Sequence, residues 1–141
     1  MIRSSIQPRL IHGLVALLTA APLSSACGDG TAEPENPTVT GNWVGSGISA
    51  GALEKWSFHL EEAPDGSVTG SFVLRVERLV FSGTLNGIHE YPALSLALDM
   101  TFFGQIVSGT YKGQMTSPES IEGEYQLVDD PQTLDLERLG T

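Results

Sequence analysis

Apolar and polar residues alternate along most of the chain after residue 38. In one stretch, Trp56, Phe58 and Leu60 are separated by Ser57 and His59. A period of two is the period of a β-strand, in which successive side chains point to opposite faces of the sheet. The alternation therefore predicts strands with one apolar face and one polar face.

A five-residue pattern, in which a central glycine is flanked two residues away by large apolar side chains, recurs along these strands. The copies are Val39–Trp43, Val68–Phe72, Phe81–Leu85, Val107–Tyr111 and Ile121–Tyr125. In a strand the two flanking side chains and the glycine share one face. Glycine on an inward face lets strands bend and approach closely. We interpret the repeat as a means of building a barrel.

The pattern predicts an all-β domain of eight strands. They are expected at about 39–46, 54–61, 67–76, 79–87, 93–102, 105–115, 120–128 and 132–139. The connections are short, as at Pro64-Asp65-Gly66, where proline presets φ and glycine supplies a positive φ. No connection accommodates a crossover helix, so the strands form an antiparallel meander. Closure into an up-and-down barrel is favoured, because it removes exposed edges.

Two other arrangements fit the same alternation. A two-sheet β-sandwich is the main alternative. A transmembrane barrel is less compatible, because it would turn the apolar face toward lipid and place Glu122 and Glu124 in the lumen.

Residues 1–26 have the organisation of a secretory signal peptide. Arg3 and Arg9 precede an apolar run, Leu14–Ala21, which the small residues Ser24-Ser25-Ala26 follow. The run is too short for a permanent membrane-spanning helix, which needs roughly 20 residues. We therefore expect an exported protein.

The residues Leu23–Cys27 resemble the bacterial lipobox, although Ser24 stands where leucine is usual. The resemblance implies lipid attachment at Cys27, the only cysteine of the chain. Because Gly28 rather than aspartate follows it, the resemblance also implies sorting to the outer membrane of the bacterial envelope. Ordinary cleavage after Ala26 is the alternative, and it predicts a free thiol and a soluble periplasmic or secreted protein.

Residues 27–38 are polar and contain glycine and proline, so we expect a flexible, lipid-attached tether ahead of a barrel domain at 39–141. The chain after residue 26 carries 5 basic and 17 acidic residues. Such a surface repels nucleic-acid phosphates, which argues against a nucleic-acid partner. It is compatible with a basic protein partner.

Thr40-Gly41-Asn42-Trp43 is similar to the Gly-x-Trp that begins the first strand of lipocalins and avidins, the calycin group. The resemblance implies a small up-and-down barrel, with Trp43 packed at its floor in a cation–π pair with Arg138. The later tryptophan-bearing strands of avidin and the C-terminal helix of lipocalins have no counterpart here. The resemblance therefore implies the fold and not biotin binding.

No catalytic or metal-binding pattern is evident. The histidines after the signal peptide, His59 and His89, lack the spacing of metal-binding motifs. Paired carboxylates such as Glu61-Glu62 lie on the expected polar face or in turns, where a general acid is not desolvated. We expect no metal, no cofactor and no enzymatic activity.

The inward apolar face is the candidate binding surface. Its expected residues are Trp43, Trp56, Phe58, Phe72, Phe81, Leu96, Leu98, Tyr111, Tyr125 and Arg138. We predict a membrane-anchored, non-catalytic binding module for a small apolar ligand, with Arg138 as one contact for an anionic group. The alternatives are an envelope protein-interaction module, such as a lysozyme or protease inhibitor, and a purely structural envelope protein.

Overall fold

The computed structural model describes residues 35–128 and 130–140. The expected signal peptide, Cys27 and the tether up to residue 34 lie outside the described residues. The strands are β1 (Gly41–Ser49), β2 (Ala52–Glu62), β3 (Ser67–Val76), β4 (Leu79–Glu90), β5 (Ala93–Phe102), β6 (Gln105–Ser117), β7 (Ser120–Gln126), β8 (Gln132–Thr133) and β9 (Leu136–Arg138).

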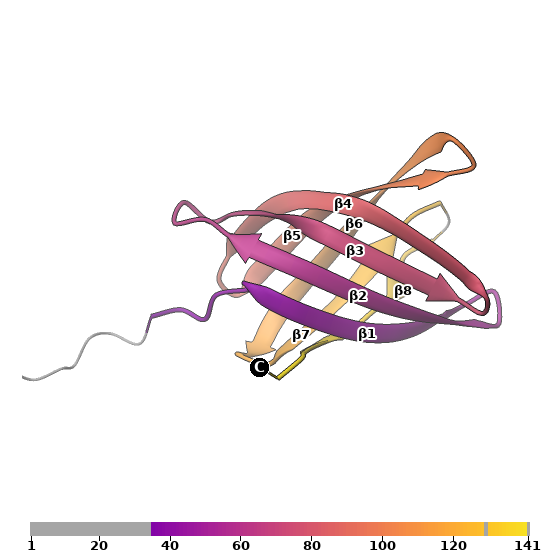
Figure 1. Ribbon diagram of the computed structural model, residues 1–141. Helices are drawn as coiled ribbons and strands as arrows, with labels where there is room; N and C mark the ends of the chain where they lie inside the picture. The colour runs from indigo at the N-terminus through magenta and orange to yellow at the C-terminus, as the bar shows by residue number, and fades with distance from the viewer. Residues whose placement is uncertain (1–34, 129, 141) are drawn as a thin grey trace, which may run out of the picture. The chain divides into compact units, whose positions relative to one another are not determined.

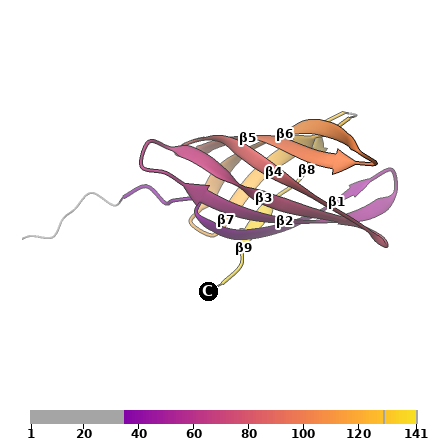
Figure 2. The ribbon, with the colours of Figure 1, turned by 45° about the horizontal axis from the view of Figure 1, so that its top comes forward.

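The strands form a closed antiparallel barrel (Figure 1). Each strand from β1 to β6 pairs with the next along the chain, and β7 pairs with β9, which returns to pair with β1. The short β8 extends the pairing along β7. The second view shows the strands wrapping round a common interior (Figure 2). The predicted up-and-down barrel is confirmed, and the sandwich alternative is wrong because β1 and β7 meet through β9.

The strand expected at 132–139 is instead divided into β8 and β9, with a break at Leu134 and Asp135. Two side chains account for the break. The Tyr111 hydroxyl donates a 3.0 Å hydrogen bond to the Leu134 carbonyl, and the Gly123 amide donates to Asp135 Oδ1 at 3.1 Å. Between β8 and β9, hydrogen bonds that involve side chains thus take the place of backbone-to-backbone hydrogen bonds of the sheet.

The expected inward face forms the core of the barrel. The flanking residues of the five-residue repeat are buried, except for the half-buried Phe81 and Val107. Polar residues such as Glu122 and Glu124 lie on the exposed outer face. A transmembrane barrel requires the reverse arrangement, so that alternative is also wrong.

Two of the five central glycines of the repeat, Gly83 and Gly123, lie beneath aromatic rings of neighbouring strands. A Cβ atom added at Gly83 would lie 2.6 Å from Phe72 Cζ, and one at Gly123 would lie 2.6 Å from Tyr111 Oη. Both glycines also approach a backbone carbonyl of the next strand too closely for a side chain. At these two glycines the repeat combines close strand packing with an aromatic cover, as the barrel interpretation expects.

The two ends of the barrel are built from different turns. The rim end carries the β1–β2, β3–β4 and β5–β6 turns and the β7–β8 connection. Its hairpin turns have two residues, with positive φ at Ala50, Glu77 and Phe103. The entry end carries the β2–β3, β4–β5 and β6–β7 turns and receives the chain as it enters β1. There, Gly66 has the positive φ predicted for the Pro64-Asp65-Gly66 turn.

Candidate functional site

Aromatic side chains fill the middle of the barrel. The Trp56 ring lies 5.7 Å from both Phe58 and Phe72 and 4.7 Å from Tyr125, measured between ring centroids. Phe58 also lies 5.7 Å from Tyr111. The packed rings therefore leave the middle of the barrel filled.

The structure brings the expected inner-wall residues together in one core, with two differences in position. Trp43, Trp56, Phe58, Phe72, Leu96, Leu98, Tyr111 and Tyr125 are buried in this core. Phe81 is half-buried toward the rim end, and Arg138 lies at the entry end. The wall thus spans the length of the barrel rather than lining one open cavity.

Arg138 and Trp43 seal the entry end. The Arg138 guanidinium lies 4.3 Å from the centroid of the Trp43 ring, which confirms the predicted cation–π pair. Its nitrogen atoms donate hydrogen bonds to the carbonyls of Thr38, Thr40 and Pro118 at 2.5–3.0 Å. The donors of Arg138 are therefore engaged by backbone carbonyls, and the anionic contact expected of it stays a prediction.

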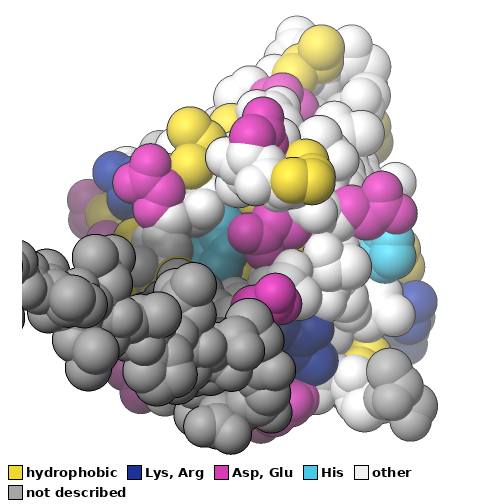
Figure 3. Space-filling view, turned by 90° about the vertical axis from the view of Figure 1, so that its left-hand side faces the viewer, with side chains coloured by type: hydrophobic (Ala, Val, Ile, Leu, Met, Phe, Trp, Pro, Cys, Tyr) yellow, Lys and Arg dark blue, Asp and Glu magenta, His cyan; other side chains and the backbone are white. Residues whose placement is uncertain are grey.

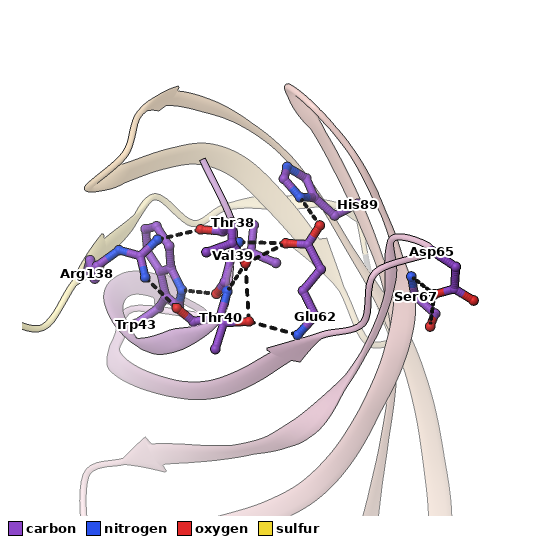
Figure 4. Close-up of polar contacts among 9 residues, drawn as sticks. All are labelled: Thr38, Val39, Thr40, Trp43, Glu62, Asp65, Ser67, His89 and Arg138. Atoms are coloured by element: carbon purple, nitrogen blue, oxygen red, sulfur yellow. Dashed lines mark hydrogen bonds and ion pairs between the residues drawn. The ribbon is translucent and has the colours of Figure 1, made fainter. Parts of the chain in front are cut away.

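Glu62 holds the incoming chain against the same end (Figure 4). Its Oε2 accepts hydrogen bonds from the Val39 amide at 2.9 Å and the Thr38 hydroxyl at 2.8 Å. Its Oε1 lies 3.0 Å from His89 Nδ1. Burial alone would raise the pKa of Glu62, but these hydrogen bonds outweigh it and lower the pKa below its ordinary value. Val39, fully buried, closes the barrel beneath this network.

A polar pocket of about 700 Å³ lies beside Glu62 at the entry end. It is lined by the segments 35–38 and 62–66 and by His89 and Tyr91. His89 is 5% exposed, and its Nε2 is the one buried side-chain polar atom without a hydrogen-bond partner among residues 35–128 and 130–140. In the space-filling view of this end, acidic side chains are spread across the face (Figure 3).

The rim end carries most of the exposed large hydrophobic residues, although its β3–β4 turn is the charged pair Glu77-Arg78. Half-buried residues continue the core toward solvent: Val76, Phe81, Val107 and Leu127. Exposed large hydrophobic residues of the strand ends and connections lie nearby. Leu79 and Phe102 are at inward-facing strand positions, Phe103 is in the β5–β6 turn and Val128 in the β7–β8 connection, and the outward-facing strand positions hold Ile48, Leu53, Val80 and Ile106. We call these two sets together the apolar rim. The other exposed large hydrophobic residues of the described chain are Ile88, Tyr91 and Leu139. Concentration of apolar surface at one end is typical of a binding site.

A buried carboxylate lies where the core meets the apolar rim. Glu54 is 8% exposed and faces inward beside Trp56, whose Nε1 donates a 3.2 Å hydrogen bond to Glu54 Oε2. The Tyr125 hydroxyl donates a second hydrogen bond to the same oxygen. Burial and the hydrogen bond to Glu54 raise the pKa of Tyr125 well above its ordinary value, which keeps the hydroxyl protonated as a donor.

Two buried polar residues, Glu54 and His89, were not among the predicted site residues. The alternation that placed Trp56 and Phe58 inward applies equally to Glu54. Strand parity alone therefore indicates that Glu54 faces inward, although its charge is typical of an exposed position. The same parity applies to His89, four residues after Leu85 on β4, but the predicted strand ended at residue 87.

The other residues that could take part in catalysis or metal binding are dispersed over the surface. His59 is exposed on β2, where its Nδ1 lies 2.9 Å from Asn42 Oδ1. Among residues 35–128 and 130–140, no three histidine, cysteine or acidic side chains are placed to hold a metal ion. The same residues contain no helix long and apolar enough to cross a membrane.

These features define a closed up-and-down β-barrel with a filled middle, a polar sealed end and an opposite end rich in exposed apolar residues. No protein-family model matches the chain, and no curated protein shows significant similarity to it. Among solved structures, the fold is similar to a redesigned β-barrel, mFAP1, bound to DFHBI. The TM-score is 0.60 at 11% identity, covering 71% of this chain and 94% of that one. A related design, mFAP0, also bound to DFHBI, has a TM-score of 0.59 at 11% identity, covering 71% and 97%. The comparison supports the barrel fold.

Proposed function

We propose that this protein is a non-catalytic binding module that takes a small apolar molecule at the rim end of its barrel. The main evidence for this proposal is that apolar side chains continue without a break from the buried core, through half-buried Phe81 and Val107, to exposed Phe102. Phe81 and Phe102 are in ring contact, with centroids 5.3 Å apart. The binding of DFHBI by the two designed barrels is consistent with a ligand site in this fold.

The entry end is a poorer site for an apolar molecule. Arg138 and Trp43 seal it, and Glu35, Glu62 and Asp65 line its pocket. Desolvating such groups without a polar partner is costly. An apolar ligand is therefore expected at the rim end alone.

Binding of 1-octanol tests this proposal. A buried CH₂ group contributes about 0.8 kcal/mol, so an octyl chain contributes at most about 6 kcal/mol, and a Kd of roughly 0.1 mM is expected. Phe102→Asp places a charge in the apolar rim and is expected to weaken binding at least tenfold in a calorimetric titration. The matched control is Ile88→Asp, an exposed position on the same sheet near the other end, which should bind like the parent. Equal weakening by both variants would contradict the rim site.

We further propose that the protein is exported and anchored to the outer membrane by lipid on Cys27. The lipobox-like residues Leu23–Cys27 support this placement. Mass spectrometry of the mature N-terminal peptide is expected to show acylated Cys27, and Cys27→Ser should release the protein from the membrane fraction. An unmodified Cys27 would favour the soluble periplasmic or secreted alternative.

A further inference from the structure

Glu54 carries a charge in surroundings that contain few groups to offset the cost of burying it. Its carboxyl lies between the aromatic core and the apolar rim, paired in the β2–β3 ladder with Val76. The basic residues of adjacent positions, Lys55 and Arg75, are exposed on the outer face of the barrel. No ion pair to Glu54 occurs among the described residues. A buried carboxylate without a cation is costly unless hydrogen bonds or a ligand compensate for its desolvation.

The barrel satisfies only one oxygen of this carboxyl group. Trp56 Nε1 and the Tyr125 hydroxyl both donate to Oε2, and no side chain of the described residues donates to Oε1. Oε1 is not among the fully buried atoms that lack a partner, so some solvent reaches it. Because aromatic rings fill the barrel on the other side of Trp56, that access comes from the rim end.

The Tyr125 ring passes close to β1 beside Gly47, which pairs with Glu54: a Cβ atom added at Gly47 would be in ordinary contact with Tyr125 Cε1, at 3.9 Å. Glu54 is held in one orientation by two donors from different strands, Trp56 on β2 and Tyr125 on β7. A held carboxylate with one open oxygen is a preorganised acceptor for a donor group of a ligand.

We propose that the rim end selects amphipathic small molecules that carry a protonated amine, with the ammonium group on Glu54 Oε1 and the apolar chain on the apolar rim. This inference rests on the proposed function and names the ligand class of the same site. The low-dielectric surroundings strengthen the interaction between the carboxylate and a cation. The net charge of −10 also attracts cationic molecules toward the protein.

Three octyl compounds that differ only in their polar group test the proposal. Octylammonium, 1-octanol and octanoate are titrated calorimetrically into the full chain carrying Cys27→Ser, at pH 7 and 0.15 M salt. This substitution prevents lipid attachment, so no detergent competes for the site. Octylammonium is expected to bind at least about tenfold more tightly than 1-octanol, and octanoate more weakly than either.

The variant Glu54→Gln keeps the shape of the side chain and removes its charge. Its preference for octylammonium over 1-octanol is expected to fall to within about twofold, while its affinity for 1-octanol is retained. Tyr125→Phe removes one donor to Oε2 and should keep the preference, which separates the role of the charge from that of the hydrogen-bond network. Glu122→Gln, on the exposed outer face, makes the same charge change away from the site and should leave all three affinities unchanged.

The outcomes separate this inference from the proposed function. If 1-octanol binds at the apolar rim and octylammonium binds no better, the amine preference is overturned and the apolar site stands. Tighter binding of octanoate overturns it as well, as does an amine preference that survives in Glu54→Gln or that Glu122→Gln abolishes. If none of the three compounds binds, the proposed function and this inference both fall.

Discussion

Two of the repeated glycines lie beneath an aromatic ring. Gly83 pairs with Phe72 in the β3–β4 ladder, and the Phe72 ring occupies the space that a Gly83 side chain would need. Gly123 pairs with Gly113 in the β6–β7 ladder, and the space that its side chain would need is occupied by Tyr111, whose hydroxyl also reaches the Leu134 carbonyl. An aromatic ring over a glycine keeps apolar surface buried where two backbones come closest.

Gly83→Ala is therefore expected to destabilise the barrel by about 1–3 kcal/mol, the usual cost of forcing extra volume into a packed core. The added Cβ would meet Phe72 Cζ at 2.6 Å and the Asp99 carbonyl oxygen, which is backbone and cannot rotate away. Chemical denaturation measures the change. Gly140→Ala, where nothing lies within 4 Å, serves as the control and should be neutral. A Gly83→Ala protein as stable as the parent would refute this packing account.

Residue-scale prediction from the sequence succeeded where parity decides burial. The alternation placed Trp56, Phe58 and Tyr111 inward, and all are buried. It could not show which inward polar groups would meet. Glu54 and Tyr125 are 71 positions apart, and only the register of the closed barrel brings them into contact.

At the scale of elements, local sequence predicted the hairpin turns correctly, but it did not predict the break in the last strand. The Pro64-Asp65-Gly66 turn forms as predicted, with the Gly66 amide donating to the Ala63 carbonyl at 2.9 Å. The break at Leu134 depends on hydrogen bonds from Tyr111 and Gly123, on distant strands. Local propensity carries no information about such partners.

The β5–β6 turn has an unusual residue at its tip. Phe103 has a φ of 46° and is 91% exposed, although a bulky side chain rarely adopts positive φ and gains nothing here from burial. Its ring contacts Phe102, with centroids 4.5 Å apart. A residue that is costly for the turn and unnecessary for the core is consistent with a role in binding.

Phe103→Asn is expected to stabilise the protein by about 0.5–1 kcal/mol, because asparagine tolerates the left-handed region. The same variant should bind 1-octanol less tightly, since it removes apolar surface from the rim. Denaturation and calorimetry give the two values. Phe102→Asn is the comparison, and its loss of contact with Phe81 should lower stability. Unchanged ligand affinity in the Phe103→Asn protein would count against a role for this turn in binding.

The attachment of the incoming chain to the entry end is expected to depend on pH. The pKa of Glu62 is lower in the folded protein than its ordinary value of 4.5. The stabilising contribution of its carboxylate is thus complete above about pH 4.5 and is lost as the pH falls through the lower folded value. The groups facing this carboxylate are Thr38, Val39 and His89.

Hydrogen exchange at the Val39 amide measures this attachment. The protection factor should be constant near neutral pH and fall below about pH 4.5. In Glu62→Gln it should be lower at neutral pH and nearly independent of pH. Glu61→Gln, an exposed neighbour, should behave like the parent. Identical pH profiles for the parent and Glu62→Gln would show that Glu62 does not hold the segment.

On the scale of the whole molecule, closure gives the barrel two unlike ends. The apolar face predicted from the alternation becomes a filled interior, so it supplies stability rather than an open cavity. Function is then left to the ends, whose chemistry depends on which turns the topology gathers there. The sequence predicted the barrel, because strand period and short connections are local properties. It did not predict the apolar rim, because Ile48, Leu79, Phe103 and Val128 come from strand ends and connections that are far apart in the sequence.

Binding of an apolar ligand at the rim end is tested by a titration of ¹⁵N-labelled protein with 1-octanol, followed by amide chemical shifts. Saturable shifts are expected at Glu54, Val76, Phe81, Val107 and Leu127, and none at Val39, His89 or Trp43. Shifts confined to the entry end or spread over the outer face, or no saturable shifts at all, would contradict it.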